Sequence, residues 1–123
     1  MRSTLIRELA RCWAVINRDL FSGAMRPPLL LVEDTPRRLG AWSKKGRTLS
    51  LSSRLLDAHP WGAVIEVLKH EMAHQYVDEV LEIHAQTAHG PAFRRVCAER
   101  SIDARAVGTP KVSTRAASVL RKV

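Results

Sequence analysis

Two histidines four residues apart, with a glutamate directly after the first, constrain this chain more than any other feature. The residues are His70-Glu71-Met72-Ala73-His74. On an α-helix, side chains four positions apart lie on the same face, so both imidazoles could reach one metal ion while the carboxylate lies beside it. The spacing therefore predicts a helix that carries two ligands of a zinc site, as in zinc hydrolases.

The residues around this motif predict the helix itself. Pro60 stands where a helix of about twenty residues would begin. An apolar stripe at three- and four-residue steps follows it and predicts a core-facing side of the helix. The stripe consists of Trp61, Val64, Ile65, Leu68 and Met72. His70 and His74 lie close to the edge of this stripe, where the helix can face both core and cleft.

A catalytic zinc site usually has three protein ligands and one open position for water, so a third ligand must come from elsewhere. In the metzincin spacing the third His would stand at position 80, which is Val80. In the thermolysin spacing a Glu would stand near positions 94 and 95, which are Arg94 and Arg95. Neither spacing fits this chain.

Two histidines remain downstream as candidates for the third ligand. His89 is followed by Gly90-Pro91, and a Gly-Pro pair that opens a helix fixes a side chain at the start of that helix. We therefore favour His89 over His84, which we expect in solvent at the end of the first metal-binding helix or in the loop after it. His59, directly before Pro60, is interpreted as a residue at the start of the helix.

The combination of HEMAH, a loop and HGPAF resembles the SprT-like metallopeptidase domain of the SprT/Spartan family of zinc proteases. Upstream segments agree with the family in order and spacing, so the resemblance covers about residues 5 to 100. These segments are Asn17-x-x-x-Phe21-x-Gly23, LLLVE at 29 to 33, Leu39-Gly40 with Trp42, and LSLSSRLLD at 49 to 57.

The resemblance implies one catalytic Zn²⁺ held by His70, His74 and His89, with Glu71 as the general base. It implies a zinc-dependent endopeptidase of SprT type that cleaves DNA-bound or DNA-crosslinked proteins, with a zinc-activated water as the nucleophile. Two alternatives stay open. One is a non-catalytic, zinc-stabilised DNA-binding or scaffold module, and the other is a metal-dependent hydrolase of a non-peptide substrate.

The chain departs from many family members in its cysteines. It contains only Cys12 and Cys97 and no C-x-x-C pair, so we expect a minimal form that lacks the C-terminal cysteine-based zinc module. Both cysteines lie in apolar helical patterns and are expected to be buried, reduced thiols, although a disulfide between them stays open.

Length and composition predict one domain. With 123 residues, of which 46% are hydrophobic, the chain can bury one core but not two. It has no run of about eighteen apolar residues and no signal-like apolar block near its start. We expect a soluble cytoplasmic protein without membrane contact, at the nucleoid in a prokaryote or in the nucleus of a eukaryote. The sequence does not indicate an oligomeric state.

The hydrophobic periodicity predicts an α+β domain with about three helices and a short, mainly antiparallel sheet. The resemblance to the SprT-like family implies that this is a zincin-like minimal domain. Helices are expected at residues 2 to 20, from Pro60 for about twenty residues, and from Pro91 to about Ala106. Strands are expected at 29 to 33, 39 to 43 and 47 to 52, with a hairpin turn at Lys44-Lys45-Gly46. Residues 1–107 would form the domain, and 108–123 a basic tail or a truncated extension.

The charge of the chain, formally +8, is unevenly distributed. Residues 1 to 47 contain ten Lys and Arg against four Asp and Glu, residues 48 to 93 two against six, and residues 94 to 123 eight against two. Basic flanks of this kind favour contacts with the phosphates of single- or double-stranded DNA, besides protein substrates, and an exposed tryptophan would stack on a base. Scattered cations can equally form a solvated face, and Trp42 could instead be a core aromatic. The candidate DNA contacts are Arg37, Arg38, Trp42, Lys44, Lys45, Arg47, Arg94 and Arg95.

Overall fold

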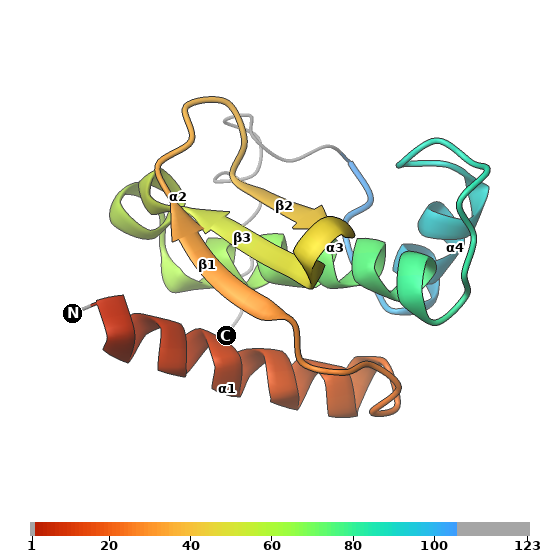
Figure 1. The fold of residues 1–123 in the computed structure, drawn as a ribbon, viewed down its shortest axis with the longest axis horizontal. Helices are drawn as coiled ribbons and strands as arrows, with labels where there is room; N and C mark the ends of the chain where they lie inside the picture. Colours follow the sequence, from red (N-terminus) through yellow and green to blue (C-terminus); the bar gives the residue numbers. More distant parts are fainter. Residues whose placement is uncertain (1, 106–123) are drawn as a thin grey trace.

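The structure, a computed structural model, describes residues 2–105, which form helices packed against one small sheet (Figure 1). The α+β zincin-like class predicted from the sequence is confirmed. The elements in chain order are α1 (Arg2–Leu20), β1 (Leu29–Glu33), β2 (Gly40–Ser43), the 3-10 helix η1 (Lys45–Arg47), β3 (Thr48–Ser52), α2 (Ser53–Ala58), α3 (Trp61–Glu79) and α4 (Pro91–Glu99).

The sheet is mixed, with strand order β1-β3-β2, and not mainly antiparallel as predicted. β3 is parallel to β1, with Leu29 opposite Thr48, and antiparallel to β2. The predicted hairpin joins β2 to β3 through η1, where Gly46 has a φ of 74°. β3 is the central strand, and it has the most buried side chains of the three, including Leu49 and Leu51. β1 and β2 are therefore the two edges of the sheet.

The hydrophobic core lies between the sheet, α1, α3 and α4. Figure 1 shows that α3 crosses behind the three strands while α1 lies along β1. α3 is buried on much of its circumference, and its buried residues include three polar ones, His70, Glu71 and Gln75. Each large apolar side chain removed from water contributes about 1.5–3 kcal/mol. The large, almost fully buried apolar side chains are Leu9, Phe21, Leu49, Leu51, Leu55, Val64, Val67, Leu68, Met72 and Phe93.

The turn after α1 explains the Asn-x-x-x-Phe-x-Gly segment of the sequence. The side-chain amide of Asn17 donates to the carbonyl of Met25 at 3.0 Å, and its Oδ1 accepts from the Met25 amide at 3.2 Å. Phe21 is buried, and Gly23 adopts a φ of 68°, which costs a glycine little. The segment thus reverses the chain and directs it into β1.

Two helical features differ from the prediction. Residues 53–58 form the additional short helix α2, which begins where the Ser52 hydroxyl accepts from the Arg54 amide at 3.1 Å. His59 consequently caps the end of α2, and Pro60 caps the start of α3.

α4 ends at Glu99 and does not extend to Ala106. Ser101 has a φ of 56°, and the amide of Ile102 donates to the carbonyl of Cys97 at 2.9 Å, which closes a Schellman motif. The helix stops here because this turn buries Ile102 in the core.

Within the described residues, the two cysteines form no disulfide. Both thiols are free, but only Cys97 is buried, whereas Cys12 is half-buried. Burial raises the pKa of the Cys97 thiol to about 12. None of the described helices has both the length and the apolar character needed to cross a membrane. The predicted domain boundary at 107 and the segment 108–123 lie outside the described residues.

Candidate metal centre

Three imidazoles meet at the cleft between β2 and the loop that joins α3 to α4. His70 and His74 come from consecutive turns of α3, and His89 comes from the end of the loop; their ligand atoms all lie within 4.8 Å of one another. The Nε2 atoms of His74 and His89 are 3.2 Å apart. Two ligands of a tetrahedral zinc ion lie about 3.3–3.4 Å apart, since each Zn–N bond is about 2.0–2.1 Å long. The donor set and its spacing therefore fit a zinc ion.

Two of the three histidines, His70 and His74, are held in the neutral form that binds metals. Burial lowers the pKa of His70. Burial, followed by the charges of His70 and His89, lowers the pKa of His74 to about 3. A metal ion at this position would therefore meet little competition from protons at His70 and His74.

A backbone carbonyl orients His70. Its Nδ1 lies 2.9 Å from the carbonyl oxygen of Asp103, which follows the Schellman turn at the end of α4. When Nδ1 donates to this oxygen, the proton stays on Nδ1 and Nε2 is the nitrogen that can bind metal. The segment after α4 is thus part of the centre.

Phe93 forms the apolar floor beneath the imidazoles. Its ring stacks on that of His74 with a centroid distance of 4.0 Å and on that of His89 at 4.9 Å. It meets the ring of His70 edge-on at 5.0 Å. This explains why the second motif is H-G-P-A-F, because the phenylalanine one turn into α4 packs against all three histidines.

The loop before α4 is compact around His89. Pro91 takes the first turn of α4, and Gly90 caps the helix. The Gln86 side chain accepts from the Ala92 amide at 2.9 Å. A Cβ atom at Gly90 would lie only 3.0 Å from the Gln86 Cβ. The absent side chain at Gly90 therefore lets the loop close behind the histidine.

Glu71 lies beside the imidazoles, buried under β2. Burial raises its pKa to about 7, while a hydrogen bond from the Trp42 backbone and the charge of Arg38 act in the lowering direction. The close approach of β2 depends on Gly40, where a Cβ atom would lie 2.9 Å from Val67 Cγ1 and 3.1 Å from Glu71 Cγ. Glycine at this position thus brings the edge strand directly over the carboxylate.

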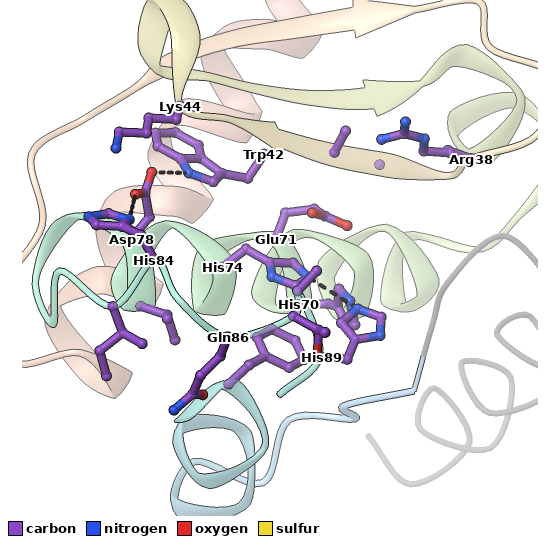
Figure 2. Close-up of a pocket in the computed structure, with 17 residues that line it drawn as sticks. Arg38, Trp42, Lys44, His70, Glu71, His74, Asp78, His84, Gln86 and His89 are labelled. Atoms are coloured by element: carbon purple, nitrogen blue, oxygen red, sulfur yellow. Dashed lines mark hydrogen bonds and ion pairs between the residues drawn. The ribbon is translucent and has the colours of Figure 1, made fainter. Parts of the chain in front are cut away.

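These groups open into a cleft of about 580 Å³ (Figure 2). One wall is the edge strand β2, and the opposite wall is the loop after α3. Arg38 and Lys44 line the cleft at opposite ends of β2, and neither side chain has an ion pair among the described residues. His84 does not join the three histidines; its Nδ1 lies 3.1 Å from Asp78 Oδ1.

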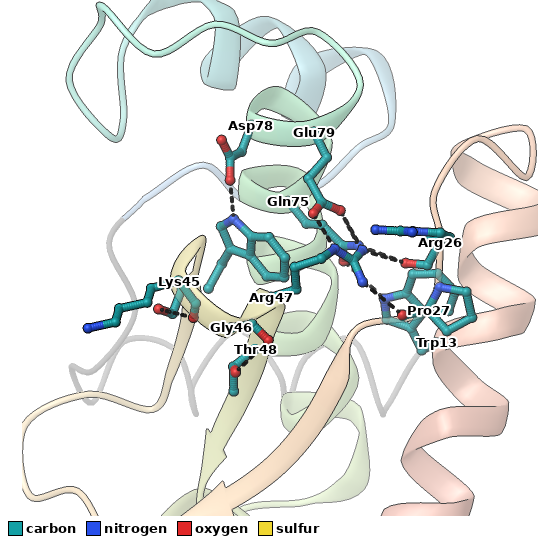
Figure 3. Close-up of polar contacts among 12 residues, drawn as sticks. Trp13, Arg26, Pro27, Lys45, Gly46, Arg47, Thr48, Gln75, Asp78 and Glu79 are labelled. Atoms are coloured by element: carbon teal, nitrogen blue, oxygen red, sulfur yellow. Dashed lines mark hydrogen bonds and ion pairs between the residues drawn. The ribbon is translucent and has the colours of Figure 1, made fainter.

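The structure separates the predicted DNA contacts into different groups. Arg37, Arg38, Lys44, Lys45, Arg94 and Arg95 are exposed. Trp42 is only partly exposed: it packs against the core, and its indole donates to Asp78 at 2.9 Å. Arg47 was predicted as a DNA contact, but its guanidinium is already paired within the protein. It donates to both Glu79 oxygens and to the carbonyls of Arg26 and Pro27 (Figure 3).

Comparison with known proteins shows which family this chain belongs to. Residues 9–114 match the model of the SprT-like family. The chain belongs to the SprT-like family. No curated protein matches it in sequence.

Two solved structures share the fold. One is the metallopeptidase zymogen jannalysin of Methanocaldococcus jannaschii, with a TM-score of 0.58 and 14% identity over 93% of this chain and 95% of that one. The other is the metallopeptidase zymogen abylysin of Pyrococcus abyssi, with a TM-score of 0.53 and 19% identity over 98% and 96% of the two chains. Family, fold and the three histidines together support a metallopeptidase-type function.

Several residues of the site were not assigned roles from the sequence. Gly40 and Phe93 stood in recognisable motifs, but the motif letters alone do not show what a glycine or a phenylalanine contacts. Asp78 was not singled out, because a carboxylate near the end of a helix gives no sign of its partners Trp42 and His84. Asp103 acts through its backbone carbonyl, so no signal in its side chain could have revealed it.

Proposed function

We propose that this SprT-like chain is a zinc-dependent endopeptidase. The observation that carries the proposal is the convergence of three imidazoles and one carboxylate at the floor of a cleft bordered by an edge strand. A purely structural zinc site would fill its fourth position with a protein ligand. Among the described residues, no fourth His, Cys, Asp or Glu joins the three histidines.

His70, His74 and His89 would hold the ion, and Glu71 would move the proton. A zinc ion bound here would supply a Lewis acid for the substrate carbonyl and lower the pKa of a bound water toward neutrality. Glu71, on the same helix face as the two α3 histidines, would accept the proton of the attacking water and pass it to the departing amine. Burial beneath β2 keeps its carboxyl group at the floor of the cleft.

A peptide suits the shape of this cleft better than a small molecule does. Within residues 2–105, β2 pairs with β3 on one side only, and Gly40, Ala41 and Trp42 line the cleft. An edge strand offers unpaired backbone amides and carbonyls, which can pair with an extended peptide. This favours a peptidase over a hydrolase of small substrates.

We further propose that the substrates are proteins bound or crosslinked to DNA. The support is the exposure of six cations on the segments that flank β2 and on α4, in a chain with a formal charge of +8. Phosphate contacts of exposed Lys and Arg give binding that weakens steeply as salt rises. Arg38 and Lys44 lie at the cleft itself, where DNA held next to the substrate would meet them.

One experiment tests both parts. Bound zinc and cleavage of a DNA-binding protein are measured for the wild type and for Glu71→Gln, without DNA and with single- or double-stranded DNA. We expect one zinc in both proteins and cleavage by the wild type only, faster with DNA. If both hold zinc and neither cleaves under any condition, the proposal is wrong and the scaffold alternative or a non-peptide hydrolase remains.

A charge reversal separates the DNA part from the peptidase part. Arg37→Glu with Lys45→Glu should weaken DNA binding at low salt and leave DNA-independent peptide cleavage unchanged. Arg11→Glu, on the exposed side of α1, serves as the matched control. Equal cleavage by the wild type with and without DNA, together with no DNA binding at low salt, would remove the DNA part alone.

A further inference from the structure

One end of the cleft is closed by three side chains from three separate elements. Asp78 of α3 accepts a hydrogen bond from the Trp42 indole on β2 through Oδ2 at 2.9 Å. Its other oxygen, Oδ1, lies 3.1 Å from Nδ1 of His84, on the loop after α3. Figure 2 shows Asp78 between the two partners, at the end of the cleft away from Arg38. One carboxylate thus joins both walls of the cleft to the metal-binding helix.

Each wall carries a different part of the site. The β2 wall is the edge strand that would pair with substrate, and Trp42 is one of its four residues. The opposite wall is the loop that ends in His89. A shift of the first wall would change the fit of a peptide, whereas a shift of the second would move a metal ligand.

The loop depends on polar anchors because it buries little apolar surface. Its residues from 84 to 88 are all exposed. The amide of Ile83 donates to the carbonyl of Val77 where the loop begins, and Gln86 bonds to the start of α4. Between these two points, the contact of His84 with Asp78 ties the middle of the loop to α3.

We propose that Asp78 is a positioning residue that sets the distance between the two walls, and that it acts on zinc affinity through His84 and on substrate affinity through Trp42. The side chain of Asp78 is only 14% exposed, so its hydrogen bonds are partly shielded from water. Hydrogen bonds to an ionised carboxylate are about twice as strong as neutral ones. The substrate half of this inference rests on the proposed peptidase function, and the zinc half does not.

Three variants separate the two walls. His84→Ala releases the loop, Trp42→Phe keeps an aromatic ring but removes the indole N–H, and Asp78→Ala releases both. Zinc affinity is measured by competition with a chelator, and KM and kcat with a fluorogenic peptide at saturating zinc. Glu82→Gln, which removes an exposed carboxylate of the same loop, is the control and should change neither quantity.

We expect His84→Ala to weaken zinc binding about fivefold with KM unchanged, and Trp42→Phe to raise KM about fivefold with zinc affinity unchanged, since each loses one hydrogen bond to a charged group. Asp78→Ala should show both effects. If all three lower the unfolding temperature while zinc affinity and KM of the folded protein stay at wild-type values, Asp78 is structural only and the inference is wrong. It is equally wrong if His84→Ala and Trp42→Phe change the same parameter.

The two proposals can fail separately. If no peptide is cleaved by the wild type, the peptidase function fails, but the zinc titration of His84→Ala and Trp42→Phe still tests the positioning role. If the wild type cleaves and neither variant departs from it in zinc affinity or KM, the positioning role fails and the peptidase function stands.

Discussion

Two groups of polar side chains lie on the same helix, α3, yet they are paired in opposite ways. Toward α1, Gln75 accepts from the Trp13 indole at 3.3 Å and donates to Glu79 at 3.1 Å, and Glu79 binds Arg47 through both oxygens at 2.6 and 2.7 Å (Figure 3). Arg47 also donates to two backbone carbonyls. We call Gln75, Glu79, Arg47 and Trp13 the α1-side network; its polar groups are satisfied by one another and by the backbone carbonyls of Arg26 and Pro27.

Toward the cleft, His70, Glu71 and His74 are also largely removed from solvent, but their functional atoms face an open space. His70 has one nitrogen bound to a carbonyl, and His74 has its Nε2 beside that of His89. Satisfied polar groups specify and stabilise a fold, whereas nitrogens and carboxylates directed at a cleft keep their capacity for a ligand. Burial alone therefore does not distinguish the structural from the reactive polar groups on α3; what distinguishes them is whether their atoms already have partners.

The largest expected effect separates two glutamates eight residues apart. Glu71→Gln should lower kcat by about 10²- to 10⁴-fold, because the general base is lost, and leave stability unchanged or slightly higher, because a buried carboxylate is removed. Glu79→Gln should leave kcat unchanged and lower stability, because it weakens the bond to Arg47. Peptide kinetics and thermal unfolding of both variants check this. A loss of activity in Glu79→Gln would contradict a purely structural role of the α1-side network.

The next effect concerns the third histidine. His89→Ala should weaken zinc binding more than about 100-fold, because loss of a ligand exceeds the 10–100-fold cost typical of an outer-shell partner. His84→Ala, which should weaken zinc binding only about fivefold, is expected to keep its zinc under conditions in which His89→Ala loses it. The zinc content of the two variants after dialysis measures this. If His84→Ala loses zinc and His89→Ala keeps it, His84 is the ligand.

The α1-side network should matter for stability alone. Arg47→Met removes four hydrogen bonds and leaves Glu79 without its ion-pair partner, so we expect a loss of about 2–3 kcal/mol in the free energy of unfolding. Arg18→Met is the control, because its pair with Asp19 is mostly exposed and should contribute little to stability. Denaturant titration measures both, and unchanged zinc affinity in Arg47→Met would confirm that the two groups are independent.

A glycine substitution tests the packing of β2 against the cleft side of α3. Gly40→Ala places a Cβ atom against Val67 and Glu71, so it should cost about 1–3 kcal/mol and also lower kcat, because β2 and the carboxylate must move apart. Gly23→Ala is the matched control. It strains a positive φ with no atom within 4 Å, so it should lower stability by about 1 kcal/mol without changing kcat. Equal kcat values for the two variants would contradict the role of Gly40.

The smallest effect is the acid dependence of the α1-side network. The hydrogen bond from Arg47 is the main cause that lowers the pKa of Glu79 below its ordinary value of 4.5. A carboxyl group whose folded-state pKa is lowered stabilises the fold above its unfolded pKa, and this stability is lost as the pH falls through the folded pKa. The difference in unfolding free energy between wild type and Arg47→Met should therefore shrink below pH 4.5. Denaturant titrations at pH 7 and at stepwise lower pH check this.

The sequence predicted those parts of the fold that local patterns determine. The helix at 2–20, the metal-binding helix and all three strands follow from periodicity and from Pro, Gly and turn residues, and the structure places them within a residue or so of the prediction. The parallel pairing of β1 with β3 was missed because strand order depends on which strand is most buried in three dimensions. The early end of α4 was missed because it depends on burial of Ile102, which periodicity interprets as more helix.

The site divides in the same way. The spacing of His70 and His74 and the Gly-Pro pair after His89 are local signals, and the structure brings these three side chains together. Arg47 was assigned to DNA because a cation in a basic segment carries no sign of its distant partner, Glu79. The hydrogen bond from Trp42 to Asp78 and the contact of His70 with the Asp103 carbonyl join residues that are far apart in sequence, so neither leaves a local pattern.

The Schellman turn after α4 has a practical meaning for anyone who wishes to shorten or fuse this domain. Helix α4 ends at Glu99, but Ile102 belongs to the core and the carbonyl of Asp103 lies 2.9 Å from His70 Nδ1. A cut placed at the visible end of the helix would therefore remove the support of His70 while leaving every histidine in the sequence. The functional boundary of the domain therefore lies at least four residues beyond the end of α4.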